Sequence, residues 1–210
     1  MKKMTQVVVA LVSLGIAEFP STALAAGTLG LEKRPSVFSY DQFELDVVFL
    51  DDLVVDRGSS LDGVRFSGSV NIEPNLALTG SVMDASGNRS DFSMGSVGAA
   101  YHQKLEGTQL KESDFIIHAN LEAMRVVVDP PVGKRQSDND LGVRAGAGLR
   151  VRVVKELEVF GDLSFRTTLD NDLVFEAGGR YAFTPKLHGT ASVEIGDIDI
   201  VSAGIRYYFD

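Results

Sequence analysis

Three side chains near the end of the chain have the types found in hydrolytic sites: His188, Ser192 and Glu194. A serine nucleophile needs a histidine within hydrogen-bonding distance to accept its proton. The three residues fall in a run that alternates polar and apolar side chains, which predicts a β-strand with all three on one face. At roughly 3.3 Å per residue, His188 and Ser192 then lie about 13 Å apart. We therefore expect no catalytic residues and no enzymatic activity, with a hydrolase kept as an alternative.

Metal and cofactor chemistry is also not expected. His102, His118 and His188 have no metal-ligand spacing, and the chain contains no cysteine. The Gly146-Ala-Gly148 pattern lies inside an alternating run instead of at a strand-to-helix turn, so it does not predict nucleotide binding. A net charge of −9 argues against nucleic acid as a partner.

The elements that position these residues are strands, because period-two alternation recurs along most of the chain. It predicts ten strands, connected in the order of an antiparallel meander. No stretch after residue 26 approaches the roughly 20 apolar residues that a membrane helix needs. The expected strands are 43–50, 63–72, 76–83, 91–102, 114–127, 141–153, 157–168, 173–183, 187–195 and 200–209.

The polar faces of these strands carry seven arginines and seven carboxylates. Mixed charge of this kind suits the interior of a narrow membrane barrel filled by ion pairs, whose apolar face is turned to lipid. A soluble barrel with a solvated charged exterior is the alternative. Eleven of these charged residues form the expected lumen network: Glu122, Arg144, Arg150, Arg152, Glu158, Asp162, Arg166, Glu176, Arg180, Glu194 and Arg206. The other three charged residues on these faces are Glu44, Asp46 and Arg65.

The N-terminus has the pattern of a secretory signal peptide. Lys2 and Lys3 precede a short apolar core at 7–17, and Ala23 and Ala25 occupy the −3 and −1 positions of a cleavage site. Cleavage after Ala25 would deliver the chain to the periplasm of a Gram-negative cell or beyond it. The expected organisation is a signal peptide at 1–25, an N-terminal periplasmic tail at 26–42 and a barrel at 43–210.

The connections between the expected strands alternate in character. Those after the second, sixth and eighth strands are short. Those after the odd-numbered strands are rich in aspartate and asparagine. An even strand number places all the acidic connections at one end of the barrel. The connection at 103–113 is longer than this rule favours. The acidic set could hold Ca²⁺ or Mg²⁺, although turn chemistry accounts for it: Asp51, Asp52, Asp56, Asp62, Asp84, Asn88, Asp91, Asp129, Asp138, Asn139, Asp140, Asp170, Asn171, Asp172, Asp197 and Asp199.

The last strand ends in a motif that resembles the β-signal of outer-membrane proteins. That signal is a polar residue, a glycine two positions later, and aromatic or apolar residues two apart near the end. Ser202, Gly204, Tyr207 and Phe209 fill these places, and Asp210 departs from the pattern by following the terminal aromatic residue. The resemblance implies recognition by the barrel-assembly machinery.

The chain as a whole resembles the small outer-membrane barrels of the OmpA-like and opacity-like type, with a porin-like β-barrel domain over roughly 43–209. The resemblance implies the cell outer membrane as location, with outer-membrane lipid and lipopolysaccharide as partners. It identifies no surface partner. Members commonly have eight strands, so eight is the alternative to the ten expected here.

A barrel of this size is narrow enough for interior side chains to fill it. We therefore expect an all-β, up-and-down antiparallel transmembrane barrel with a largely plugged lumen and a structural or surface-interaction role. The alternatives are a narrow porin-like channel for small solutes, an outer-membrane hydrolase and a soluble periplasmic ligand-binding barrel.

Overall fold

A computed structural model describes residues 36–52, 60–87, 89–105, 112–129, 134–168 and 171–209. These residues form ten strands. In the described ranges, no helix is both long enough and apolar enough to span a bilayer. The strands are β1 (Gln42–Asp52), β2 (Ser60–Glu73), β3 (Leu76–Ser86), β4 (Ser90–Lys104), β5 (Ser113–Val128), β6 (Gln136–Val154), β7 (Leu157–Arg166), β8 (Asp172–Ala182), β9 (Leu187–Ile195) and β10 (Ile198–Tyr208). The expectation of ten strands is confirmed against the alternative of eight.

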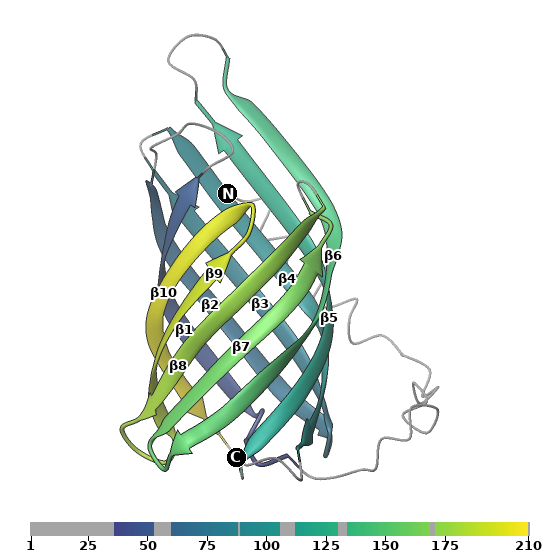
Figure 1. Cartoon of the computed structure of the whole chain (residues 1–210). Coiled ribbons are helices and arrows are strands. Elements are labelled where there is room, and N and C mark those ends of the chain that lie inside the picture. The colour runs from purple at the N-terminus through teal and green to yellow at the C-terminus, as the bar shows by residue number, and fades with distance from the viewer. Residues whose placement is uncertain are drawn as a thin grey trace.

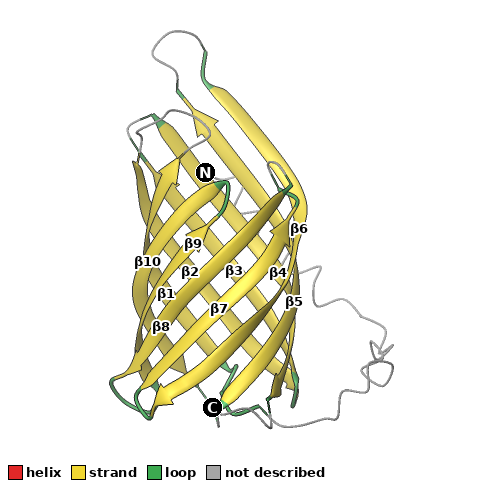
Figure 2. Cartoon of the chain, in the orientation of Figure 1, coloured by secondary structure: helices red, strands yellow, loops and turns green. Residues whose placement is uncertain are grey.

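The strands form one closed antiparallel barrel (Figure 1). Each strand pairs with its neighbours in sequence, and β1 closes the ring by pairing with β10 from Gln42↔Tyr208 to Asp52↔Ile198. The start of β1 and the end of β10 therefore lie at one end of the barrel, called here the terminal end. The opposite rim, the distal end, carries the connections that follow the odd-numbered strands (Figure 2). The acidic connections expected from the sequence all belong to the distal end.

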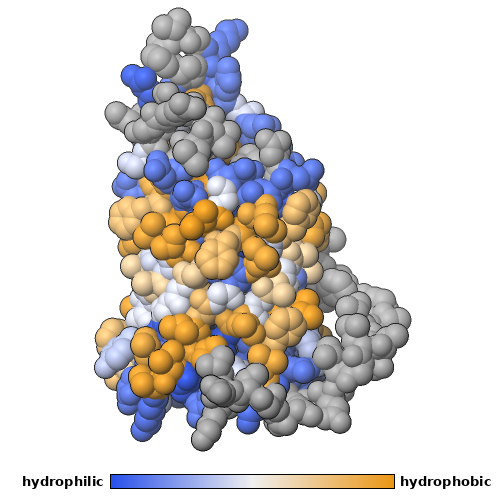
Figure 3. Space-filling model, viewed as in Figure 1, coloured by the Kyte–Doolittle hydropathy of each residue, from blue (hydrophilic) through white to orange (hydrophobic). Residues whose placement is uncertain are grey.

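Around the middle of the barrel, apolar side chains face outward and charged side chains face inward. Leu121 and Phe175 face outward and are 52% and 47% exposed, whereas Arg150 and Glu194 face inward and are 2% and 3% exposed. On the face shown in Figure 3, side chains of high or intermediate hydropathy cover most of the wall, and hydrophilic side chains gather at both ends. This distribution is the reverse of a soluble barrel, whose apolar side chains fill the interior.

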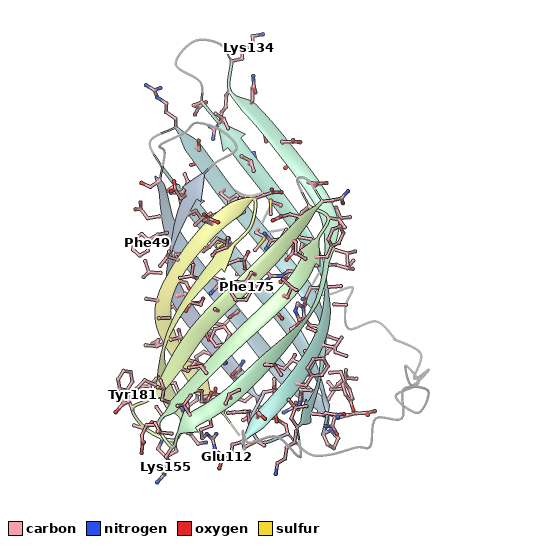
Figure 4. All side chains as sticks on the ribbon, in the orientation of Figure 1. Phe49, Glu112, Lys134, Lys155, Phe175 and Tyr181 are labelled. Carbon is pink, nitrogen blue, oxygen red and sulfur yellow. The ribbon has the colours of Figure 1, made fainter. Side chains whose placement is uncertain are left out.

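Aromatic side chains gather on the outer surface towards the terminal end. Phe43 lies 5.3 Å from Tyr207 and 6.3 Å from Phe209 between ring centroids. Tyr181 and Phe183 form a second pair at 5.6 Å. Phe49 and Phe175 face outward nearer the distal end (Figure 4). Such rings suit the boundary between hydrocarbon and headgroups.

The β5–β6 hairpin rises above the rest of the distal rim (Figure 1). β5 and β6 pair as far as Val128↔Gln136, whereas β6 begins to pair with β7 only at Arg144↔Arg166. The sequence places the start of this strand at 141, five residues too late. Its first residues are polar and exposed on both faces, so they lack the alternation that identifies a half-buried strand.

Candidate functional site

The interior of the barrel holds three layers of side chains along its axis. The distal layer is apolar and consists of Val48, Leu50, Leu61, Met83, Ala85, Phe92, Met94, Met124, Ile198 and Ile200. The middle layer is charged and consists of Asp46, Arg65, His118, Glu122, Arg144, Asp162, Arg166, Glu176 and Glu194. The terminal layer consists of Glu44, Arg150, Arg152, Glu158, Arg180, Arg206 and Tyr208, together with the segment 36–41.

Glu194 joins two arginines at the centre of the middle layer. One of its oxygens lies 2.9 Å from Nη1 of Arg144, and the other lies 2.8 Å from Nη2 of Arg166. Arg166 also donates from Nε to Glu122 at 3.1 Å. Arg144 lies 3.8 Å from both Asp162 and Glu176 through Nη2. β5, β6, β7, β8 and β9 all contribute to this network, so it connects the wall across the lumen.

The middle layer contains more carboxylates than arginines. Arg65 pairs with Asp46 at 3.0 Å, and Nε2 of His118 lies 2.8 Å from Asp162. Five carboxylates, those of Asp46, Glu122, Asp162, Glu176 and Glu194, therefore share three guanidinium groups. The middle layer thus has two more carboxylates than guanidinium groups, and the terminal layer, with four arginines and two glutamates, has the opposite excess.

Arg150 organises the terminal layer. It contacts Glu158 through Nη2 at 2.7 Å and donates to the Tyr208 hydroxyl at 2.6 Å. Arg152 reaches the other oxygen of Glu158 at 3.5 Å, and Arg206 pairs with Glu44. These pairs link β6, β7, β10 and β1 around the closure of the barrel.

Arg180 differs from the other arginines of the expected network. Within the described ranges it makes no ion pair, and its guanidinium stacks on the Phe160 ring at 4.0 Å. Thus the structure places ten of the eleven expected residues in ion pairs, and it places Arg180 against an aromatic face. Cation–π contact can offset part of the cost of burying an arginine.

The segment 36–41 lies across the terminal mouth of the barrel. Phe38 and Tyr40 are buried, with the Arg150 guanidinium 4.3 Å from the Phe38 ring and Tyr40 stacked on His102 at 3.7 Å. Asp114 accepts hydrogen bonds from Ser36 and from the backbone N–H of residue 37, the latter at 3.1 Å. Burial raises the pKa of the Tyr40 phenol, which keeps it a neutral donor. The segment therefore places two buried aromatic rings in this mouth.

The signals for the distal layer and for the segment 36–41 are weak in the sequence. In β1 the inward positions change from Glu44 and Asp46 to Val48 and Leu50, so the run 47–50 is apolar on both faces. That continuous run is the one visible signal for an apolar interior. Phe38 and Tyr40 flank Ser39, but this pattern is too short to identify a buried segment.

The three side chains of hydrolytic type have separate partners. The His188 ring packs against Tyr208 at 4.8 Å, Ser192 shares a hydrogen bond with Ser202 at 2.8 Å, and Glu194 is held by its two arginines. Hence no described contact joins the serine to the histidine. The described residues also include no group of three histidines or acidic residues placed to hold a metal ion.

Gly204, in the C-terminal motif, lies where β10 meets β1. A Cβ atom there would come within 2.1 Å of the Leu45 carbonyl oxygen, so this position has no room for a larger residue. Ser202 faces the lumen, whereas Tyr207 and Phe209 face outward beside Phe43. The motif thus combines close backbone approach on the inside with aromatic contact on the outside.

The fold and its interior define a class: closed antiparallel barrels with an apolar exterior and an ion-paired lumen. No protein-family model and no curated protein sequence matches the chain. Among solved structures, it is similar to the KdgM porin (12% identity, TM-score 0.45), over 80% of this chain and 99% of that one.

Two further solved structures show the same level of similarity. The N-terminal β-barrel domain of Pseudomonas aeruginosa OprF is 12% identical, with a TM-score of 0.43, over 80% of this chain and 98% of that one. Ail, the attachment invasion locus protein of Yersinia pestis, is 11% identical, with a TM-score of 0.42, over 79% and 95%. Likeness at this level concerns the barrel fold alone.

Proposed function

We propose that the protein is an integral outer-membrane β-barrel with a structural or surface-interaction role and a lumen closed to solutes. The observation that carries this proposal is the distribution of side chains: half-exposed leucines and phenylalanines outside, buried arginines and glutamates inside. We propose no enzymatic activity, since the polar groups of the lumen are engaged with one another.

Membrane insertion follows from the closure of the sheet. Lipid offers no hydrogen-bonding partners, so every backbone N–H and C=O must be paired within the protein. The β1–β10 pairing leaves no edge strand at mid-height. In water, the exposed apolar band would instead promote aggregation. A soluble periplasmic barrel therefore fits the described surface poorly.

Closure of the lumen rests on two barriers of different chemistry. The distal layer is apolar and excludes water, while Phe38 and Tyr40 cover the terminal mouth. Between them, the ion pairs of the middle layer span the lumen. A solute or ion would have to disrupt all three layers to pass.

Planar-bilayer recording of the full chain tests this proposal. We expect no stable current at physiological salt, with a folded barrel shown on the same preparation by heat-modifiable gel mobility. A reproducible single-channel current would overturn the closed lumen. Recovery of the protein in the periplasmic fraction without detergent would overturn the membrane assignment.

A narrow solute channel is the second candidate, and one observation favours it. Hydroxyl and amide side chains line the β3–β5 side of the middle layer: Thr79 bonds to Asn120 at 2.8 Å, and Ser81 bonds to Ser96 at 2.7 Å. This polar strip is where a water path would run if the apolar distal layer opened. The same bilayer recording distinguishes the two candidates.

Export and assembly complete the proposal. The signal peptide at 1–25 lies outside the described residues, and mass spectrometry of the mature protein would test cleavage after Ala25. We propose that the C-terminal motif is read by the barrel-assembly machinery. The acidic distal rim would meet lipopolysaccharide phosphates through bridging divalent cations.

A further inference from the structure

The three methionines that follow Met4 all lie in one row of the distal layer. Met83 is on β3, Met94 on β4 and Met124 on β5. The strand register pairs Met83 with Met94 and Met94 with Met124. All three side chains face the lumen and are buried, at 3%, 7% and 3% exposure. Three thioethers on directly adjacent strands, at one height, form a local concentration of sulfur.

The spacing of the row allows the sulfurs to converge. Adjacent strands are about 4.8 Å apart, so the backbones of Met83 and Met124 are roughly 10 Å apart with Met94 between them. The wall is concave towards the lumen, and each methionine has three rotatable side-chain bonds. The two outer side chains can therefore reach over the central one.

Three converging thioethers suit a trigonal metal centre. A metal–sulfur distance of about 2.3 Å, as in zinc–thiolate bonds, places the three sulfurs about 4 Å from one another. That separation is ordinary van der Waals contact. A small cation can thus enter a packed trio of methionines without needing a cavity prepared in advance.

Ligand chemistry selects the metal. Thioethers are soft donors and favour Cu(I), whereas Ca²⁺ and Mg²⁺ require oxygen ligands. The neighbours on the distal side of the trio are apolar: Phe92 lies two residues from Met94 on the same face, and Leu50 and Ile200 belong to the same cluster. This shell excludes the water that a hard cation would retain.

The charge of the adjoining layer also favours a bound cation. Glu122 lies two residues from Met124 on the same inward face of β5, and it belongs to the middle layer, in which five carboxylates share three arginines. Burying a positive charge in apolar surroundings is costly. The extra carboxylates of the adjoining layer lower that cost.

We propose that Met83, Met94 and Met124 form a binding site for a soft monovalent cation, Cu(I) or Ag(I), in the distal half of the lumen. The site does not depend on the proposed function, because the strand register brings the three residues side by side whether the barrel conducts or not.

The test uses the full chain folded in detergent, with its methionine methyl groups labelled with ¹³C, and silver nitrate as the probe. Three barrel methyl resonances should shift together and saturate at one equivalent of Ag⁺. Cu(I), supplied with a reductant and a competing chelator, should produce the same pattern. Resonances that stay in place at one equivalent of either ion would overturn the proposal.

Met94→Leu removes the central sulfur at nearly constant volume, and Val97→Leu, which faces outward on the same strand, is the matched control. We expect Met94→Leu to weaken Ag⁺ binding at least about tenfold, with Val97→Leu within about threefold of the parent. Unchanged affinity in Met94→Leu would assign the binding to histidines or carboxylates and refute the site. If Met94→Leu fails to fold by gel mobility, Met83→Leu and Met124→Leu take its place.

Discussion

Glu194→Gln should destabilise the barrel far more than the loss of an exposed ion pair. Glu194 is buried and accepts from Arg144 at 2.9 Å and from Arg166 at 2.8 Å, one arginine on each carboxylate oxygen. A glutamine of the same shape retains one acceptor and turns an amide group towards the second guanidinium. The variant therefore removes a direct carboxylate partner from a buried arginine, whose other carboxylate contacts are longer, at 3.1–3.8 Å, while the packing volume is unchanged.

The magnitude follows from burial. Removing one partner of a buried ion pair costs about 3–5 kcal/mol, because the remaining charge stays desolvated. The matched control is Asp91→Asn at the distal rim, where Asp91 pairs with Arg135 at 3.0 Å and the Arg135 side chain is 58% exposed. Exposed pairs of this kind contribute about 0–1 kcal/mol. We expect the two variants to differ by at least about 2 kcal/mol.

Equilibrium unfolding in urea measures this difference, with the barrel folded in lipid vesicles and followed by far-ultraviolet circular dichroism. The chain has no tryptophan, so circular dichroism and heat-modifiable mobility replace indole fluorescence. Unfolding midpoints must be compared at equal slope. If Glu194→Gln unfolded at the same urea concentration as Asp91→Asn, the middle layer would be solvated, and the reasoning about a closed lumen would be wrong.

Three further predictions test other parts of the structure. Replacing both Phe38 and Tyr40 with alanine should leave bilayer conductance near zero, because the distal layer still excludes water; a large current would show that the segment 36–41 is the sole barrier. Gly204→Val should abolish heat-modifiable mobility, since its Cβ would come within 2.1 Å of the Leu45 carbonyl oxygen. Ala203→Val, which faces outward on the same strand, should assemble normally, and equal assembly of both variants would contradict the steric argument. Leu163→Arg, on the half-exposed outer face, should cost about 2–4 kcal/mol in vesicle unfolding if the residue lies near the bilayer midplane; a change below about 0.5 kcal/mol would place it in water.

The strands were predictable because each has two chemically different faces. Apolar side chains occupy the outward face, as at Leu121, Val143, Leu163 and Phe175. Charged side chains occupy the inward face, as at Glu122 and Glu176. Period two then fixes which residues face inward and excludes register shifts by one residue, but not shifts by two. Alternation is weakest in β4, so the sequence leaves eight strands open as an alternative, and the closed ring shows ten.

Sequence reasoning missed the apolar part of the interior, where the side chains on the inward face are apolar like those on the outward face. Val48 and Leu50 face inward although their outward neighbours are also apolar, and Met83, Met94 and Met124 face inward on three different strands. No local pattern shows that these positions meet across the lumen. Their meeting depends on strand register, which is a long-range property.

Spin labelling tests the orientation of the side chains most directly, because the chain has no native cysteine that would also be labelled. Single cysteines for attaching the label would replace Val201, Ala203 and Ile205, which face outward on β10, and Ser192 and Ser202, which face inward. In lipid vesicles, dissolved oxygen, which partitions into hydrocarbon, should relax the outward labels strongly and the inward labels weakly. Strong oxygen relaxation at the two serine positions, with the outward three reached by a water-soluble nickel complex, would contradict this orientation.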